Sequence, residues 1–142
     1  MIKNIFNPGN YSGNINLTLL LLRIAIGAFM LSHGIGKFSN LFGDEPITFA
    51  DPIGLGVTTS LALTVFAEVF CSGLLIMGIA TRLATVPLII TMLVAVFIVQ
   101  ANKEFGDMEL PLLYLIIYLV IAITRAGKYS IDNWIHKKMA HS

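Results

Sequence analysis

Charged residues are scarce in this chain of 142 residues, because only 12% are Asp, Glu, Lys or Arg. An average soluble domain has about 25%. The formal net charge is +1, which excludes the basic surface that nucleic-acid binding requires. Cysteine occurs once, so neither an intramolecular disulfide framework nor a cysteine-based structural zinc site is expected.

Hydrophobic residues take the place of the missing charges. They make up 56% of the chain, and the mean hydropathy is +0.84. This composition is the opposite of that of a disordered chain. A soluble domain of this length could not cover so much apolar surface. The sequence therefore predicts a small membrane protein.

Four stretches are long enough to cross a bilayer core about 30 Å thick, which takes about 20 helical residues. They are residues 16–38, 59–79, 83–101 and 110–125. Their apolar runs are continuous, which favours helices over the alternating strands of a barrel. The turn between the second and third stretches is very short and predicts an antiparallel hairpin. We expect one all-α domain over residues 1–142, an integral membrane four-helix bundle with up-down-up-down topology.

Lysine and arginine placement predicts the orientation, because cytoplasmic segments carry the excess of these residues. If both termini are cytoplasmic, six lysines and arginines lie on the cytoplasmic side of the membrane, and two, Lys37 and Lys103, lie on the outer side. The inside residues are Lys3, Arg82, Arg125, Lys128, Lys137 and Lys138. Residues 130–139 predict a short amphipathic segment with Ser130 as its N-cap and Trp134 as an interfacial anchor.

Ionisable residues within the first span need an explanation, since each costs about 2.5–3.5 kcal/mol on membrane-insertion scales. At 100° per residue one stripe about 80° wide holds two cations and two glycines, and His33 lies at its edge. Glycines let another helix or a ligand approach the backbone closely. This face is expected to point into the bundle; it carries Arg23, Gly27, Met30, Gly34 and Lys37.

Glu68 falls near the middle of the second span, where a carboxylate must be paired, hydrogen-bonded or protonated. We expect it to contact Arg23 or His33, and we favour Arg23 because its guanidinium fork matches a carboxylate. Tyr114 and Tyr118 in the fourth span either pack or complete this polar interior. No metal site is expected, because His33, Glu68 and Cys71 lack a ligand spacing.

Three motifs resemble those of the DoxX family, in the family's order. The first is R-x-x-x-G-x-x-x-x-x-H-G-x-x-K, from Arg23 to Lys37. The second is F-A-E-V-F-C-S-G-L-L-I-M-G-I-A-T-R-L, from Phe66. It supplies Glu68 and the structural or topological positions Gly73, Gly78 and Arg82. The third is G-K-Y-S-I-D, from Gly127. The family tends to have Gly-x-Gly-Arg there, which this chain replaces by Ala126-Gly127-Lys128.

The resemblance implies a four-span protein of a bacterial or archaeal cell membrane, connected with quinol oxidation, redox stress or thiol homeostasis. Together with the polar face, it suggests a membrane subunit of a quinone-linked redox or redox-stress system. A ligand or proton site would lie between the first two spans. Arg23, His33 and Lys37 would donate hydrogen bonds to a quinone, and Glu68 or His33 would relay protons.

The sequence encodes no cofactor motif, with neither a haem-ligand pattern in the spans nor a dinucleotide motif. Whether the chain is an enzyme by itself stays open, and a non-catalytic subunit is one expectation. The expected partners are the bilayer, a redox partner subunit that supplies electrons, and a second copy of the chain in a homo-oligomer. Two alternatives remain. One is a permease for a redox-active or aromatic compound; the other is an assembly subunit with a structural Arg23–Glu68 pair.

Overall fold

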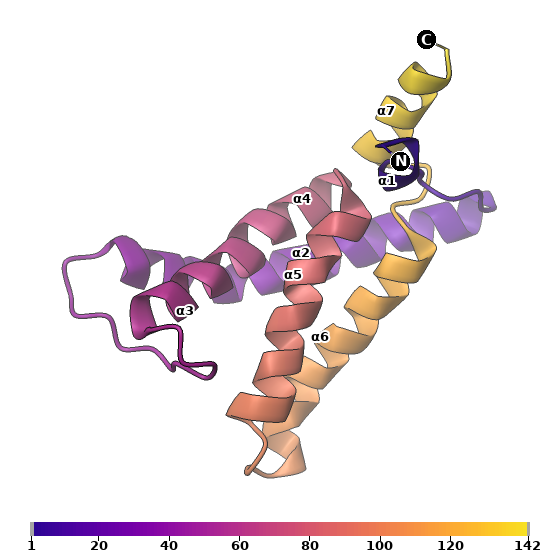
Figure 1. Ribbon diagram of the computed structural model, residues 1–142. Coiled ribbons are helices and arrows are strands. Elements are labelled where there is room, and N and C mark those ends of the chain that lie inside the picture. The colour runs from indigo at the N-terminus through magenta and orange to yellow at the C-terminus, as the bar shows by residue number, and fades with distance from the viewer. Residues whose placement is uncertain (1, 142) are drawn as a thin grey trace.

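The computed structural model describes residues 2–141, and the regular structure in that range is helical. The chain runs from the end that carries both termini to the opposite end and back, twice (Figure 1). In order the elements are α1 (Ile2–Ile5), α2 (Gly13–Phe42), α3 (Val57–Val65), η1 (Phe66–Cys71), α4 (Ser72–Met77), α5 (Thr81–Val94), η2 (Ala95–Val99), α6 (Phe105–Thr124) and α7 (Ile131–Ala140).

Four continuous helical segments in the described range are long and apolar enough to cross a membrane: Gly13–Phe42, Val57–Met77, Thr81–Val99 and Phe105–Thr124. The predicted all-α, four-span fold is confirmed. The first segment has 30 residues, so it is about 45 Å long and exceeds the bilayer core. The predicted C-terminal helix is present as α7, and Ser130 Oγ accepts the N–H of Asn133 at 3.2 Å, as an N-cap does.

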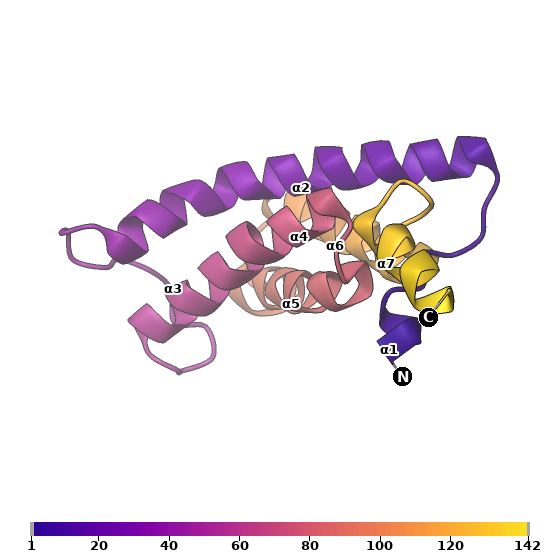
Figure 2. The ribbon, with the colours of Figure 1, turned by 90° about the horizontal axis from the view of Figure 1, so that it is seen from above.

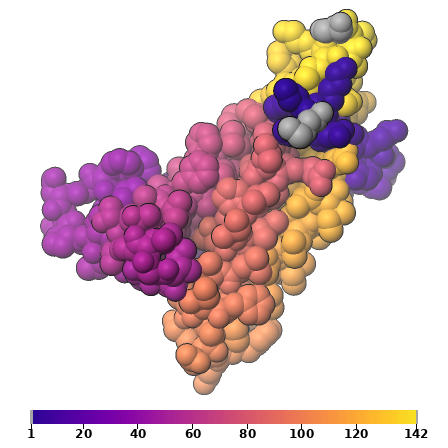
Figure 3. Space-filling model, in the orientation of Figure 1, coloured from indigo at the N-terminus to yellow at the C-terminus, as the bar shows by residue number. Residues whose placement is uncertain are grey.

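The four spans are arranged as two pairs. One pair is α2 with α3, η1 and α4, and the other is α5 with α6 (Figures 1 and 2). The pairs meet at the end that carries both termini and separate toward the opposite end. The space-filling view shows this separation as two arms with a hollow between them (Figure 3). The candidate site lies where the arms begin to part.

Two glycines set the register between α2 and the second span. A Cβ on Gly27 would lie 2.6 Å from Ile76 Cγ1 and 3.2 Å from the carbonyl oxygen of Ser72. A Cβ on Gly34 would lie 2.9 Å from Glu68 Cβ. Both glycines are buried, so the predicted inward-facing stripe is confirmed. The helices approach closely because no side chain separates them.

Two widened turns interrupt the spans. η1 and η2 have π-helical hydrogen bonding, as in the 2.9 Å bond from the N–H of Gln100 to the carbonyl of Ala95. Such turns are rare and often occur at functional sites. Hydropathy and periodicity do not predict them here. η1 carries Glu68, and η2 contributes Ala95 and Val99 to the wall of a cavity beside Glu68.

Candidate functional site

An ion pair joins α2 to η1. Lys37 Nζ donates to both carboxylate oxygens of Glu68, at 2.6 and 2.7 Å. The Glu68 side chain is 4% exposed and the Lys37 side chain 33%. Glu68 therefore has a partner, but the expected contact with Arg23 or His33 is wrong.

The helix register explains why. If the midpoints of the first two predicted spans are aligned, residue 27 of the first span lies opposite residue 69 of the second. The glycine contacts instead place Gly34 against Val69 and Glu68, a slide of about 10 Å along the helices. Glu68 consequently lies one turn from Lys37. Arg23 is fourteen residues from Lys37, about 21 Å along α2.

Two cavities border the ion pair, and both are lined by Lys37 and Glu68. The first measures about 250 Å³ and is mainly apolar, with walls from α3, α5, η2 and the 43–56 loop. The second also measures about 250 Å³, and its other polar lining residues are His33, Gln100 and Tyr114. The ion pair therefore forms a shared wall between an apolar space and a more polar one.

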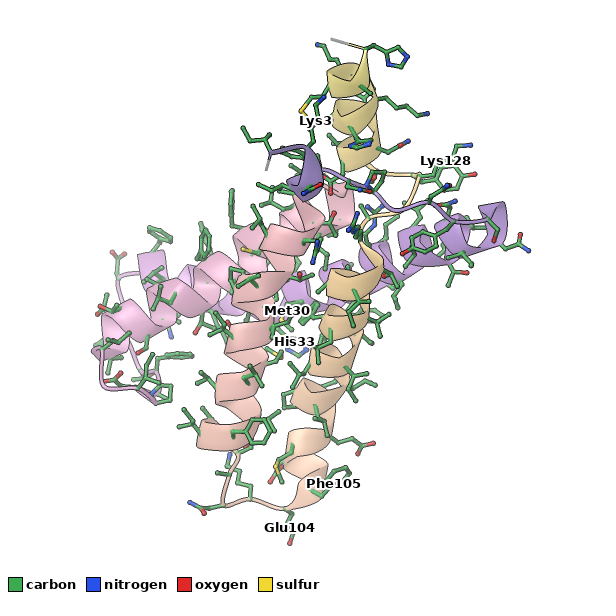
Figure 4. All side chains as sticks on the ribbon, turned by 45° about the vertical axis from the view of Figure 1, so that its right-hand side comes forward. Lys3, Met30, His33, Glu104, Phe105 and Lys128 are labelled. Atoms are coloured by element: carbon green, nitrogen blue, oxygen red, sulfur yellow. The ribbon has the colours of Figure 1, made fainter. Side chains whose placement is uncertain are left out.

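Four of the six predicted ligand residues meet around the second cavity: His33, Lys37, Glu68 and Tyr114. We call these four residues the ion-pair site. His33 packs edge-on against Tyr114, with ring centroids 6.1 Å apart. Figure 4 shows Met30 and His33 where α2 crosses the α5–α6 pair. Tyr118 lies one turn further along α6, its ring 6.0 Å from that of Tyr114. It is fully buried and does not line either cavity.

The loop at residues 43–56 closes one side of the first cavity. Asp51 holds it: its carboxylate accepts the Ser60 hydroxyl at 2.8 Å and the N–H groups of Leu55 and Gly56 at 2.9 and 3.0 Å. The Ser60 hydrogen bond, followed by these backbone bonds, lowers the pKa of Asp51 from its ordinary value. Phe49 and Pro52 from this loop line the cavity. The sequence does not predict this role of the loop, because an apolar loop residue carries no signal that it covers a cavity.

Arg23 lies at the other end of the molecule, away from Glu68. It is fully buried, and its Nη2 donates to the carbonyl of Tyr129 at 2.6 Å. Its guanidinium is within electrostatic reach of Asp132, and its Nη1 lies against Gly78. Gly78 ends α4 with φ +69°, and a side chain there would occupy the place of the guanidinium.

Asp132 completes this group, which we call the terminal cluster: Arg23, Gly78, Tyr129 and Asp132. The Asp132 carboxylate is buried and accepts the N–H groups of Ala80 at 2.7 Å and Thr81 at 3.0 Å. These amides begin α5, where the helix dipole favours a negative charge. The Asp132 N–H donates to the carbonyl of Gly78 at 2.8 Å. The cluster therefore fastens α7 to α2 and to the α4–α5 turn.

Asp132 ends the third motif, and the sequence predicts no role for it. Its position two residues after the N-cap Ser130 is a local signal, which does not reveal a contact with the start of α5. Of the structural positions expected from the second motif, Gly78 has a close contact, whereas a Cβ on Gly73 would meet nothing within 4 Å. Arg82 is exposed at the start of α5.

The ion-pair site can donate hydrogen bonds and exchange protons. An ammonium group has three donors, and Glu68 takes two of those of Lys37. No other hydrogen bond of the Lys37 ammonium is formed in the described range, and Lys37 lines both cavities. Within residues 2–141, no three His, Cys, Asp or Glu side chains come together as a metal site requires.

Comparison with known proteins places this chain in a family. The DoxX family profile matches residues 18–101. A Bacillus subtilis protein named "Putative oxidoreductase CatD" is 30% identical over 120 residues, which cover 83% of this chain and 87% of the relative. An uncharacterised Haemophilus influenzae protein is 30% identical over 128 residues, covering 84% and 92%.

An uncharacterised membrane protein of Mycobacterium tuberculosis is 34% identical over 86 residues, covering 58% of this chain and 51% of the relative. No solved structure gives a significant match. The family profile spans more than half of the chain, and the Bacillus subtilis relative aligns over most of both sequences. This membrane protein belongs to the DoxX family.

Proposed function

We propose that this protein is the membrane subunit of a quinone-linked redox or redox-stress system, and that the ion-pair site takes up the quinone head group. One observation carries the proposal. A lysine–glutamate pair lies inside the bundle, where an unneeded pair would be costly, and it borders two cavities of about 250 Å³ each. The name of the Bacillus subtilis relative, an oxidoreductase, is consistent with this role.

The chemistry of quinones matches the side chains of the site. A quinone has two carbonyl oxygens that accept hydrogen bonds, and its reduction by two electrons takes up two protons. The third donor of Lys37 and the hydroxyl of Tyr114 are available to a carbonyl in the second cavity. Glu68 and His33 exchange protons with the head group or with water. A partner subunit supplies the electrons.

The first cavity suits the apolar part of such a ligand. Its walls include Leu63, Ile90 and Val94, together with Phe49 and Ile53 of the 43–56 loop. An aromatic ring face or an isoprenoid chain buries apolar surface there. Small-molecule sites are generally lined by apolar side chains with a few polar groups that fix the orientation of the ligand, and the ion pair beside the apolar first cavity fits this description.

The proposed setting is a bacterial or archaeal cell membrane with both termini in the cytoplasm. Both termini and the α4–α5 turn lie at one end of the molecule (Figure 1), which carries five lysines and arginines outside the spans and Arg82 at the start of α5. A reporter fused after Ser142 that is active only in the cytoplasm tests this orientation. Activity of a periplasmic reporter at the same place would reverse it.

Binding of ubiquinone-1 and menadione to the purified full chain in nanodiscs, measured by equilibrium dialysis, tests the function. We expect saturable binding of at least one of the two. Glu68→Gln and Lys37→Met should each weaken it about 10- to 100-fold, because a hydrogen bond to a charged group contributes about 1.5–3 kcal/mol. Glu45→Gln and Lys103→Met make matched changes at exposed positions and should leave binding unchanged.

Four results would count against the proposal. Absence of saturable binding would show that the protein does not bind a quinone. Equal binding by Glu68→Gln and the native chain would show that the quinone does not bind at the ion-pair site. Accumulation of menadione inside proteoliposomes, driven by a gradient, would support a permease instead. If Glu68→Gln and Lys37→Met only lower the amount of protein in the membrane, an assembly subunit is the better description.

A further inference from the structure

A third cavity lies at the end of the molecule that carries both termini. It measures about 320 Å³ and is formed where the segment before α2 meets the connection from α6 to α7. Figure 4 labels Lys128 at this junction. The polar side chains around it are those of Asn10, Tyr11, Asn16, Lys128, Asn133 and Lys137.

Hydrogen bonds fix the backbone around this cavity. Asn16 Nδ2 donates to the carbonyls of Tyr11 at 2.7 Å and Ser12 at 2.9 Å, and its Oδ1 accepts the N–H of Lys128 at 2.7 Å. Asn133 Nδ2 donates to the carbonyl of Lys128 at 2.9 Å. Asn16 is itself buried. The cavity is therefore built by a buried amide that joins segments more than a hundred residues apart, and it does not depend on a chance approach of loose tails.

The charge around the cavity is positive and uncompensated. Lys128 and Lys137 line it, and none of its lining residues is acidic. The single acidic residue of α7, Asp132, turns its carboxylate to the amides of Ala80 and Thr81. Neither lysine forms an ion pair with another residue in the described range. Their ammonium groups are therefore available to an anion from outside the chain.

We propose that this cavity binds a phosphate group, as part of an anionic lipid headgroup or as free phosphate. The cavity lining includes two ammonium groups, the Tyr11 side chain and the Asn10 amide. Several donors in one cavity suit the multiple acceptor oxygens of a phosphate better than the two of a carboxylate. This site is separate from the ion-pair site, and it does not rest on the proposed function.

Its position favours the lipid headgroup as the source. The fourth span ends at Thr124, only four residues before Lys128. Trp134 of α7 is 63% exposed, with Lys138 Nζ 5.3 Å from its ring centre, as expected at a membrane interface. Basic pockets at this level of membrane proteins bind anionic headgroups. A lipid held between Lys128 and Lys137 would join the α6–α7 connection to α7 and keep α7 on the membrane surface.

Native mass spectrometry of the delipidated full chain, titrated with phosphatidylglycerol or phosphatidylcholine, tests the proposal. One phosphatidylglycerol should bind in preference to phosphatidylcholine. Lys128→Gln and Lys137→Gln should each weaken binding about fivefold, and the double variant about 30-fold, from the attraction of about one charge per lysine at a membrane surface. Lys103→Gln removes a positive charge at the opposite end and should bind as the native chain does.

A second measurement separates the two sources of phosphate. Inorganic phosphate is added to lipid-free protein in detergent, and the melting temperature of the native chain is compared with that of the double variant. Stabilisation of the native chain alone would assign the site to free phosphate. Phosphatidylglycerol binding without that stabilisation assigns it to the lipid.

Three results would overturn the proposal: equal binding of the two lipids with no effect of inorganic phosphate, an unchanged affinity in the double variant, or an equal loss in Lys103→Gln. The side chains of Lys128 and Lys137 are exposed, so the variants are expected to fold. Fluorescence of Trp134, the single tryptophan of the chain, checks that α7 keeps its structure.

Discussion

The terminal cluster and the ion-pair site each hold a cation from α2 against the second span, yet their surroundings differ. In the terminal cluster Arg23 is 0% exposed, bonded to a backbone carbonyl, and packed against a glycine that leaves no room for a side chain. In the ion-pair site Lys37 is one-third exposed and borders two cavities.

This difference separates two uses of a buried charge. Arg23 and Asp132 are buried and bond to backbone groups of the α6–α7 connection and the α4–α5 turn, so the terminal cluster stabilises the attachment of α7. The ion-pair site keeps a spare donor on Lys37 and has space beside it, so a ligand can compete for the pair. Each of the following changes tests that division, from the largest expected effect to the smallest.

Asp132→Ala should have the largest effect on stability. It leaves the buried guanidinium of Arg23 without its countercharge and the first amides of α5 without their acceptor. The loss of two hydrogen bonds to a charged acceptor should by itself cost about 3–6 kcal/mol, at about 1.5–3 kcal/mol each. Unfolding of the purified chain in detergent by heat or denaturant measures the loss.

Asp107→Ala is the control, since Asp107 is exposed in the first turn of α6, where an acidic residue contributes about 0.3–1 kcal/mol. The part of the Asp132→Ala protein that stays folded should still bind ubiquinone-1 with native affinity. Equal destabilisation by the two variants would show that the terminal cluster does not hold α7.

Lys37→Met should destabilise less but weaken ubiquinone-1 binding about 10- to 100-fold. Glu68 loses its partner, which costs about 1–3 kcal/mol, and the value should fall near the lower end because Lys37 is partly solvated. Adding Glu68→Met replaces the whole pair by apolar side chains and should restore most of the stability. Ubiquinone-1 binding should stay weakened in both variants. If the double variant regained ubiquinone-1 binding together with stability, the Lys37–Glu68 pair would have a structural role only.

Much of the fold follows from the sequence, because local signals determine it. Hydropathy predicts each span, and the spacing of Gly27 and Gly34 predicts the buried face of α2. Ser130 predicts the start of α7. Each of these depends on residues within a few turns of one another, where helix geometry is fixed.

The partner of Glu68 depends on how two helices slide along each other, and no local pattern fixes that distance. Both Arg23 and Lys37 lie on the predicted stripe, so the stripe alone does not choose between them. The close contact of Gly34 with Glu68 fixes how far the two helices slide, and this places Lys37 beside Glu68. The attachment of Asp132 and the cavity wall formed by the 43–56 loop were missed for the same reason, since both join segments far apart in the sequence.

Acidification should release the 43–56 loop from the first cavity. Hydrogen bonds from Ser60 and from backbone amides lower the pKa of Asp51 in the folded protein. A lowered carboxyl pKa adds stability above its unfolded value of about 3.9, and this is lost as the pH falls through the lower folded pKa. Hydrogen exchange at the Leu55 and Gly56 amides, corrected for the intrinsic rate, should therefore increase below about pH 4.

Asp51→Asn should remove this pH dependence and raise exchange at neutral pH, whereas Asp44→Asn in the same loop should change neither. The terminal cluster should keep its protection over the same range, since its acceptor Asp132 is buried against α5. Simultaneous exposure of both regions would mean that acid unfolds the whole chain and not the loop alone.

The smallest effects should come from Tyr114 and Tyr118, which mark the boundary of the ion-pair site. The hydroxyl of Tyr118 is buried and makes no hydrogen bond with the described residues, so Tyr118→Phe should change stability by less than about 1 kcal/mol and leave ubiquinone-1 affinity unchanged. Tyr114 lines the second cavity. Tyr114→Phe should weaken binding about three- to tenfold, the loss of one neutral hydrogen bond. Equal losses of affinity in the two variants would extend the site one helical turn toward the terminal cluster.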